Sequence, residues 1–346
     1  MQSLDRTISN KIANASIVCA LLVILIHTNT SAPDGAPIWW LHRMISSGVG
    51  RMAVPFFFAV SGYLFASHFN DDDWWVNENK KRVKSLLVPY LCWSAVYVAM
   101  VVGTRVMANL RAGRGAFDAD ISCFGFYLNA FGFSLDEPML GPLWYVRGLI
   151  IVVFLSPIIK ALLRLRMWAL LGVFAFEFVF YRYLPSMKGS VFRCLIPSVG
   201  ILYFTVGAYL RVKDWHGRFF GRGISWCLLS VGACLMAARN YFVYHGAQSW
   251  PECFSFVAVP LLCIGLWGVI SERQWPKWFT SCAFPIYLCH PIVNWPHYFL
   301  PCHDWLVKTT AGWFVHAACL IVGSIAVAML LRRFMPRAAK MLFGGR

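Results

Sequence analysis

Long apolar runs, separated by shorter polar connections, make up most of this chain of 346 residues. A bilayer core needs about 20 mostly apolar residues per helix, and ten runs approach that length. The pattern therefore predicts an all-α polytopic membrane protein, a single integral membrane domain over 1–346. The ten helices are predicted near 12–30, 48–69, 86–106, 139–160, 166–184, 194–212, 224–243, 253–270, 278–300 and 312–331.

The composition supports this prediction. Hydrophobic residues make up 59% of the chain, charged residues only 13%, and the mean hydropathy is +0.60. A soluble core cannot bury so much apolar surface. The first apolar run has no small-residue cleavage site after it, so we expect it to remain as the first helix.

The basic residues indicate the orientation. The formal net charge is +16, and most of the 31 Lys and Arg residues fall in alternate connections, on the side of both termini. The positive-inside rule then predicts cytoplasmic N- and C-termini, in a multi-pass protein of the inner (cytoplasmic) membrane. No basic patch interleaved with aromatic residues is found on a soluble domain, so we expect no nucleic-acid partner.

The cysteines predict neither a disulfide framework nor a metal site. Most of the twelve lie inside the predicted helices. No CxxC is present, and Cys302–His303 has no second pair at the spacing of metal ligands.

A few ionisable residues lie inside the predicted helices, where charges are costly and usually functional. They are His27, Arg51, Arg147, Glu177 and Arg193. Counted along helices of opposite direction, all five fall at a similar depth in the outer half of the membrane. A neutral histidine beside a carboxylate and guanidinium groups is suited to general base catalysis on an alcohol, with an arginine stabilising a developing oxyanion. We therefore predict His27, Arg147 and Glu177 as catalytic residues.

Structural roles are the alternatives for these positions. His27 would then bond a backbone carbonyl in the bundle, and the arginines would anchor helix ends at the interface. His290, between two prolines, is balanced between a site residue and a core residue. The small pair Ser61–Gly62 permits close approach either of a neighbouring helix or of a bound chain.

Six cations are predicted to form a basic rim on the cytoplasmic side. Such a rim attracts the phosphates of a donor such as acyl-CoA, but it also attracts anionic lipid head groups and determines topology. The rim consists of Lys80, Lys81, Arg82, Lys84, Arg164 and Arg166.

Six motifs occur in order along the chain and together resemble the membrane-bound acyltransferase 3 family. The resemblance covers about 12–331 and is greatest to bacterial members that O-acetylate surface glycans, such as enterobacterial common antigen. The motifs are VILIHT, AVPFFFAVSGYL, LVPYLCW, GPLWYVRGLIIV, ILYFTVGAYL and FPIYLCHP.

The resemblance implies a ten-helix enzyme that moves an acyl group, commonly acetyl, from cytoplasmic acyl-CoA to a hydroxyl of a surface or lipid-linked glycan. Acetyl-CoA would be a donor substrate, and no cofactor would be bound permanently. Membrane lipid, acyl-CoA and the glycan are the expected partners, and a homo-oligomer is compatible. His27 matches the catalytic histidine of the family. Substrate contacts are predicted for Arg51, Ser61, Trp144, Arg193 and His290.

The chain departs from the family pattern at one position. The family has an arginine eleven residues before the catalytic histidine, and Ser16 stands there in this sequence. Lys11 and Arg6 are the candidates to replace that cation from the cytoplasmic end.

Three other interpretations stay open. The first is an acyl-His27 intermediate in place of general base catalysis. The second is a transporter or flippase that uses the same buried histidine, glutamate and arginines as a substrate or proton site. The third is a sensor or assembly partner without catalysis.

Overall fold

The computed structural model describes most of the chain, and every regular element in the described part is helical. The sequence-predicted helix near 166–184 falls largely outside this part, and so do Arg166, Glu177 and Arg193. The described residues are 5–133, 137–165, 168, 170–176, 197–215, 220–247 and 250–345.

In the described part of the chain, six helical segments are long and apolar enough to cross a membrane, so the prediction of a multi-pass all-α membrane protein is confirmed. Two of them are composite: α2, η1 and α3 follow one another over Pro37–Ala66, and α4, η2 and α5 over Trp74–Arg111. The count of ten stays a prediction. The segments contain α1 (Arg6–His27), α2 (Pro37–Ser46), η1 (Val49–Met52), α3 (Ala53–Ala66), α4 (Trp74–Arg82), the π-helical η2 (Val83–Leu87), α5 (Val88–Arg111), α13 (Arg222–Tyr244), α14 (Glu252–Val269) and α18 (Thr310–Phe334).

Two segments predicted as continuous helices are interrupted, which corrects the sequence prediction. The segment near 139–160 consists of α8 (Leu143–Phe154) and α9 (Ser156–Leu162), bent by 62° at the break, and Pro157 lies in the first turn of the second helix. The segment near 278–300 is divided into α15 (Lys277–Thr280), α16 (Ala283–Asn294) and the 3₁₀ turn η5 (Trp295–Phe299).

The remaining elements are short. The predicted helix near 194–212 is α12, an apolar helix of 15 residues. Between the longer helices lie α6 (Ala119–Ser122), α7 (Phe124–Ala130), η3 (Leu163–Leu165), α12 (Ser198–Val212), α17 (His303–Lys308) and α19 (Pro336–Leu342).

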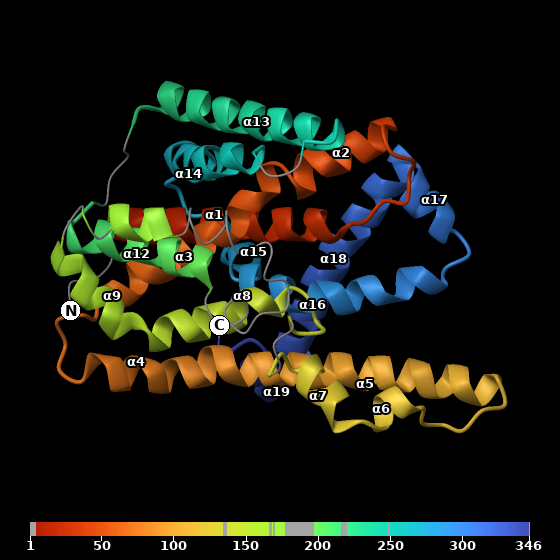
Figure 1. Cartoon of the computed structure of the whole chain (residues 1–346). Helices are drawn as coiled ribbons and strands as arrows, with labels where there is room; N and C mark the ends of the chain where they lie inside the picture. Colours follow the sequence, from red (N-terminus) through yellow and green to blue (C-terminus); the bar gives the residue numbers. More distant parts are fainter. Residues whose placement is uncertain are drawn as a thin grey trace.

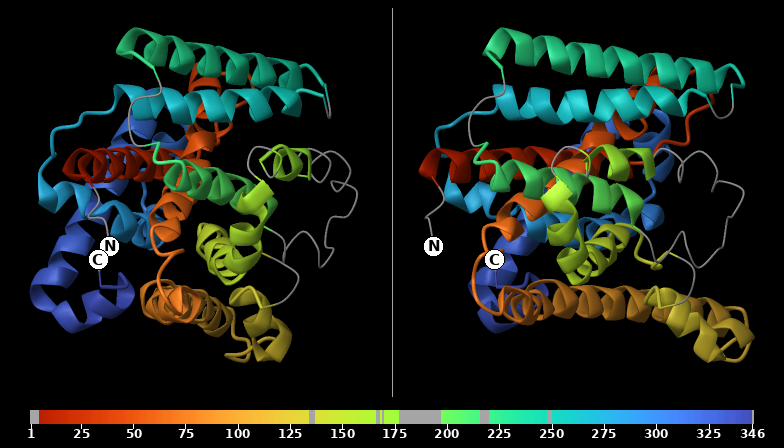
Figure 2. Two further views of the ribbon diagram at one scale, coloured as in Figure 1. Left: turned by 90° about the vertical axis from the view of Figure 1, so that its left-hand side faces the viewer. Right: turned by 60° about the vertical axis from the view of Figure 1, so that its left-hand side comes forward.

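The first helix, α1, lies in the interior of the bundle (Figure 1). In this view α13 and α14 run along one side of it, and the long α4–α5 segment runs along the opposite side. Helices α3, α16 and α18 contact α1 directly. The N-terminal end of α1 lies at the edge of the bundle (Figure 2), and its last turn contacts α16 and α18 through hydrogen bonds at His27 and Thr28.

Helices α3 and α12 pack with their backbones in contact at two glycines. A Cβ added at Gly62 would lie 2.0 Å from the Phe204 carbonyl oxygen, and one added at Gly207 would lie 1.8 Å from the Ala59 carbonyl oxygen. Of the two roles considered for the small pair Ser61–Gly62, Gly62 therefore serves the close approach of a neighbouring helix.

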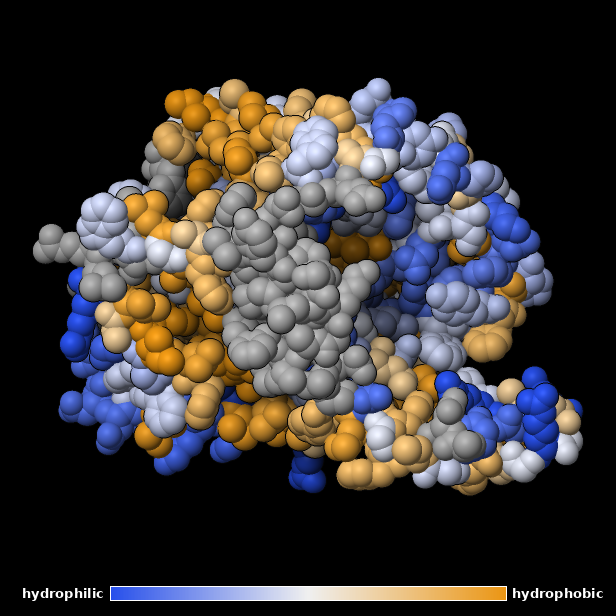
Figure 3. Space-filling view, in the orientation of Figure 1, coloured by the Kyte–Doolittle hydropathy of each residue, from blue (hydrophilic) through white to orange (hydrophobic). Residues whose placement is uncertain are grey.

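The outer surface of the bundle is largely hydrophobic. Residues of high hydropathy gather over α13 and α14 and on the left of the face in Figure 3, and hydrophilic residues gather around α17 and along the lower left. Large side chains are exposed on several helices, among them Trp226 at 60% and Val322 at 65%. A lipid bilayer is the solvent that such a surface requires.

Candidate active site

His27 lies at one wall of a cavity of about 360 Å³, which we call the His27 pocket. Helix α1 supplies His27, η1 supplies Arg51, α8 supplies Trp144, and α12, α14 and α16 complete the wall. Most of the lining is apolar and aromatic, with a few polar groups, which is the usual composition of a small-molecule site. The remaining lining residues include Val23, Ile26, Ser46, Val54, Pro142, Phe174, Leu202, Tyr203, Ser255, Phe256 and Tyr287.

Two neighbouring helices hold the backbone around His27. Helix α1 ends at His27, and the Asn294 side chain of α16 donates to the His27 carbonyl oxygen at 3.3 Å. The Trp313 indole of α18 donates to the Thr28 carbonyl oxygen at 2.7 Å. These bonds satisfy carbonyls that the end of a helix leaves unpaired, and they place the His27 ring relative to α16.

An ion-pair network supports the arginine of this pocket. Arg51 Nη1 lies 3.1 Å from Glu252 Oε2, and Arg239 of α13 pairs with the other Glu252 oxygen. Ser255, which also lines the pocket, accepts from Arg51 at 3.3 Å. The network ties η1, α13 and α14 together, and it directs Arg51 by charge-assisted bonds.

Sequence reasoning missed Glu252, because it placed that carboxylate at the edge of a helix among ordinary loop acids. The sequence could have placed Glu252 in the first turn of α14, because an acidic side chain is favourable at the N-terminus of a helix. The pairing with Arg51 spans 201 positions and has no local sequence signal.

The structure brings some of the predicted site residues together and places others elsewhere. Arg51 and Trp144 line the pocket with His27. His290 lies behind His27, with ring centroids 5.1 Å apart. Arg147 is absent from the described lining and donates to the Gly132 carbonyl oxygen at 2.9 Å. Glu177 and Arg193, as stated above, lie outside the described residues.

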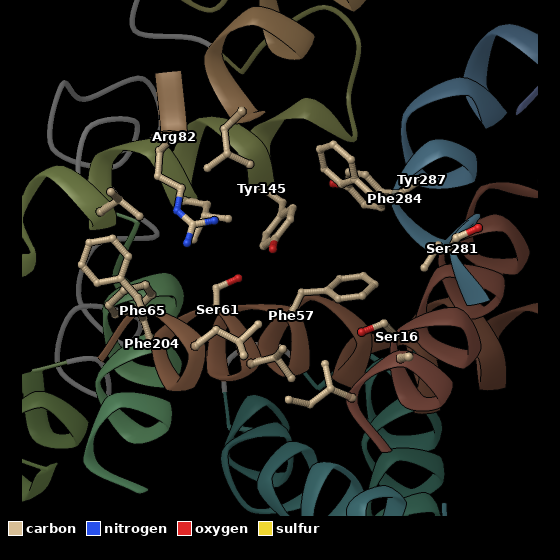
Figure 4. Close-up of a pocket in the computed structure, with 18 of the residues that line it drawn as sticks. Ser16, Phe57, Ser61, Phe65, Arg82, Tyr145, Phe204, Ser281, Phe284 and Tyr287 are labelled. Carbon is tan, nitrogen blue, oxygen red and sulfur yellow. The ribbon is translucent and has the colours of Figure 1, made fainter. Parts of the chain in front are cut away.

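A second cavity, of about 560 Å³, borders the first half of α1, and we call it the Arg82 pocket. Figure 4 shows its polar side chains. The Arg82 guanidinium, the Ser61 hydroxyl and the Tyr145 hydroxyl point into the space from α4, α3 and α8. Ser16 of α1 and Ser281 lie at the other side. Ser61, predicted to bind substrate, therefore belongs to this second cavity.

Among the rim residues that the structure describes, which exclude Arg166, Arg82 is the one that lines a cavity. Its Nη2 lies 3.2 Å from Oε2 of Glu78, and its buried Nε has no hydrogen-bond partner in the described part of the chain. Glu78 is 2% exposed and also pairs with Lys81 at 2.6 Å. Lys80, Lys81, Lys84 and Arg164 are exposed.

In the Arg82 pocket, which Ser16 of α1 lines, the positive charge comes from a different helix, α4. Neither Lys11 nor Arg6, the expected replacements for the missing arginine, is among the described lining residues. Lys11 is buried, and its ammonium group lies 4.6 Å from the centre of the Trp267 ring. The guanidinium that faces this cavity is that of Arg82.

Tyr287 of α16 lines both cavities. Its hydroxyl donates to the carbonyl oxygen of Pro142, the residue before α8. The rings of Tyr145 and Phe57 lie 5.6 and 6.1 Å from the Tyr287 ring. The two pockets therefore share the Tyr287 side chain as a common wall residue, within an aromatic cluster.

Among the described residues, no group of three or more His, Cys, Asp or Glu side chains is arranged to hold a metal ion.

Comparison with known proteins identifies the family. The model described as "Acyltransferase domain", that of the acyltransferase 3 family, matches residues 15–333. The chain belongs to the acyltransferase 3 family. It is also 25% identical to the succinoglycan biosynthesis protein ExoH of Rhizobium meliloti (strain 1021), over 99% of this chain and 94% of that protein. The comparison with solved structures finds no significant match.

Membership of the acyltransferase 3 family makes this chain a membrane acyltransferase. It argues against the transporter or flippase interpretation and against a protein without catalysis. The family resemblance inferred from the six motifs is confirmed over nearly the whole chain.

Proposed function

We propose that this acyltransferase moves an acetyl group from cytoplasmic acetyl-CoA to a hydroxyl of a surface or lipid-linked glycan, with His27 as the general base. The protein would lie in the inner membrane, among its lipids, with both termini in the cytoplasm. It would use acetyl-CoA as a substrate and hold no permanent cofactor. A homo-oligomer is compatible with this function.

The observation that carries this proposal is the pair of cavities on either side of Tyr287, which lines both. The Arg82 pocket borders the first half of α1, and the His27 pocket borders its last turn. With a cytoplasmic N-terminus, the first pocket faces the cytoplasm and the second faces outward. A donor and an acceptor from opposite sides would then approach one another within a single enzyme.

The volumes suit these two roles. Both cavities fall within the range of about 300–1,000 Å³ usual for ligand sites. The Arg82 pocket is lined mainly by apolar and aromatic side chains, which suits a pantetheine arm, and Arg82 supplies a positive charge for the CoA phosphates. The exposed Lys80 and Lys81 extend that charge to the surface.

The chemistry follows from the groups in the His27 pocket. His27 accepts the proton of the glycan hydroxyl as its oxygen attacks the thioester carbonyl carbon. The new C–O bond forms, the C–S bond breaks, and the CoA thiolate takes a proton back from His27. Arg51 lines the same cavity, so it is placed to stabilise charge on the thioester oxygen or to orient the acceptor. We retain Arg147 and Glu177 as candidates for the same tasks.

The glycan acceptor is supported by the name of the relative and by the aromatic lining. The relative acts in succinoglycan biosynthesis according to its name, and succinoglycan is a polysaccharide. Trp144 and Tyr203 in the His27 pocket offer amphipathic rings on which a sugar can rest.

Replacing Arg82 with alanine is expected to raise the KM for acetyl-CoA about 10- to 100-fold, because a hydrogen-bonded charge facing the CoA phosphates is lost. The helix should survive the change, since Glu78 keeps its ion pair with Lys81. The measurement is the initial rate of transfer against acetyl-CoA concentration in membranes with matched amounts of protein.

Lys84→Ala is the matched control. It removes an exposed cation two residues away that does not line the pocket, so its KM should change less than threefold. If Arg82→Ala raised the KM for acetyl-CoA no more than Lys84→Ala does, the CoA phosphates would bind elsewhere.

The function itself is tested with two measurements. Purified protein is incubated with acetyl-CoA radiolabelled on the acetyl group, and surface polysaccharides of a deletion strain and its parent are compared by mass spectrometry. We expect slow release of labelled acetate without acceptor, and loss of acetyl groups from a glycan in the deletion strain. Labelled acetyl-CoA that stays intact, together with an unchanged glycan profile, would contradict the proposal.

A further inference from the structure

His290 lies directly behind the proposed base. The ring of His27, at the end of α1, and that of His290, on α16, have centroids 5.1 Å apart and planes inclined by 39°. His290 is completely buried, whereas His27 is only half-buried and faces its pocket. The two imidazoles therefore form a pair, of which one member meets the cavity and the other is enclosed.

The hydrogen bonds of His290 determine its tautomer. Its Nδ1 lies 2.9 Å from the carbonyl oxygen of Tyr287 and 3.1 Å from that of Ile286. Because a carbonyl oxygen only accepts, Nδ1 carries the hydrogen. In the neutral ring Nε2 is then an acceptor, and it is buried without a hydrogen-bond partner in the described part of the chain.

A buried acceptor that lacks a donor calls for an explanation, because native structures satisfy nearly all such groups. His27 is the nearest ring that can supply one. Neither of its ring nitrogens has a hydrogen-bond partner among the described residues, and its backbone is held to α16 by Asn294. Catalytic hydrogen bonds are often open in the free enzyme and close when the substrate is bound.

We propose that His290 is the positioning residue of His27: its Nε2 accepts a hydrogen bond from one ring nitrogen of His27 and leaves the other nitrogen free to act as the base. The inference rests on the proposed role of His27. When His27 takes the hydroxyl proton, both of its nitrogens carry hydrogen, and the Nε2 acceptor stabilises the cation. His290 itself neither gains nor loses a proton in this cycle.

A neutral imidazole suits this place better than a carboxylate. The carboxylate that orients a catalytic histidine in hydrolases is stabilised by surrounding donors. Here the two carbonyls that fix His290 are themselves acceptors, and an enclosed anion beside them would be costly. A neutral imidazole can donate to those carbonyls through Nδ1 and accept from His27 through Nε2, so it matches both neighbours.

The other titratable groups on the elements packed against α1 lie at different places. Arg51 of η1 and Tyr287 of α16 line the His27 pocket, and Glu252 of α14 pairs with Arg51. His316 of α18 bonds Asn294 at 2.8 Å, and the ring of His42 of α2 lies 6.5 Å from that of Trp313.

Two variants separate this role from simple packing. His290→Gln keeps a polar group at the position of Nε2, whereas His290→Asn keeps one only at the position of Nδ1. We expect His290→Asn to lower kcat about 10- to 100-fold with little change in the KM for acetyl-CoA, and His290→Gln to recover most of that loss. The substrate is acetyl-CoA. The purified full-length protein is incubated with it, and the release of the CoA thiol is measured over time.

The pH profile supplies a second measurement. Without the acceptor the His27 cation is less stable, so the acid limb of the pH–rate profile should move to lower pH in His290→Asn and much less in His290→Gln. Equal kcat values for the two variants, with the acid limb unmoved, would overturn the proposal.

The double variant separates this proposal from the role of His27. In a His27→Ala background, His290→Asn should have no further effect on the residual rate, because the group that it positions is absent. A further loss of tenfold in that background would assign His290 a different role. If His27→Ala alone kept full activity, the proposed function of His27 would fail first, whatever the His290 variants show.

Discussion

Substituting alanine for His27 is expected to lower acyl transfer about 100- to 10,000-fold, the usual contribution of a general base. The substitution removes the one imidazole that lines the pocket beside Arg51 and Trp144. Stability should change little, because Asn294 and Trp313 bond to backbone carbonyls and both bonds survive. The measurement is the transfer of radiolabelled acetyl groups in membranes, normalised to the amount of protein.

His245→Ala serves as the control histidine. His245 is exposed just after α13 and lines neither cavity, so its replacement should leave the transfer rate within twofold of the unmodified protein. Full activity in His27→Ala would exclude the general base mechanism. If the unmodified protein retains the acetyl label on His27 after an acid quench, the mechanism proceeds through an acyl-His27 intermediate instead of general base catalysis.

The sequence predicted part of the neighbourhood of His27, namely Arg51 and Trp144. Depth in a membrane helix follows from counting residues, and counting placed His27 and Arg51 at the same level. The structure places both on one pocket with Trp144. The pairing of Arg51 with Glu252 could not be predicted, because it depends on how α14 packs against η1, and no periodic pattern reports a contact between distant helices.

The basic rim shows a similar limit. Six cations were predicted to face the cytoplasm together, but the pattern does not tell which of them turns inward. Arg82 does so at the last residue of α4, one turn after the buried Glu78 with which it pairs. Its neighbours Lys81 and Lys84 remain exposed.

The positions of the helix breaks could not be predicted from the sequence either. An apolar run reports how much chain lies in the membrane, and it does not report whether the chain crosses straight. The runs near 139–160 and 278–300 contain prolines compatible with either a kinked or a straight helix. In the structure, α8 and α9 meet at 62°, and α16 is separate from α15. Both breaks belong to segments that line the pockets.

The second large effect is expected on stability, from replacing Gly207 with valine. A Cβ at this position would lie 1.8 Å from the Ala59 carbonyl oxygen, and backbone cannot move aside as a flexible side chain can. The two helices would have to separate, at a cost above the 1–3 kcal/mol of ordinary overpacking. We expect a fall in Tm of about 5 °C or more, measured on the detergent-purified protein by its thermal unfolding curve.

Gly103→Val is the matched control, because a Cβ at Gly103 in α5 meets nothing within 4 Å, and its Tm should stay within about 1 °C of the unmodified protein. The effect of Gly207→Val should extend to catalysis. Helix α3 contributes Ser61 to the Arg82 pocket and Val54 to the His27 pocket, so displacing it deforms both. If Gly207→Val can be purified, it should therefore have both a lower Tm and a higher KM for acetyl-CoA than the unmodified protein. A lower Tm with an unchanged KM would mean that the pockets do not depend on the contact between α3 and α12.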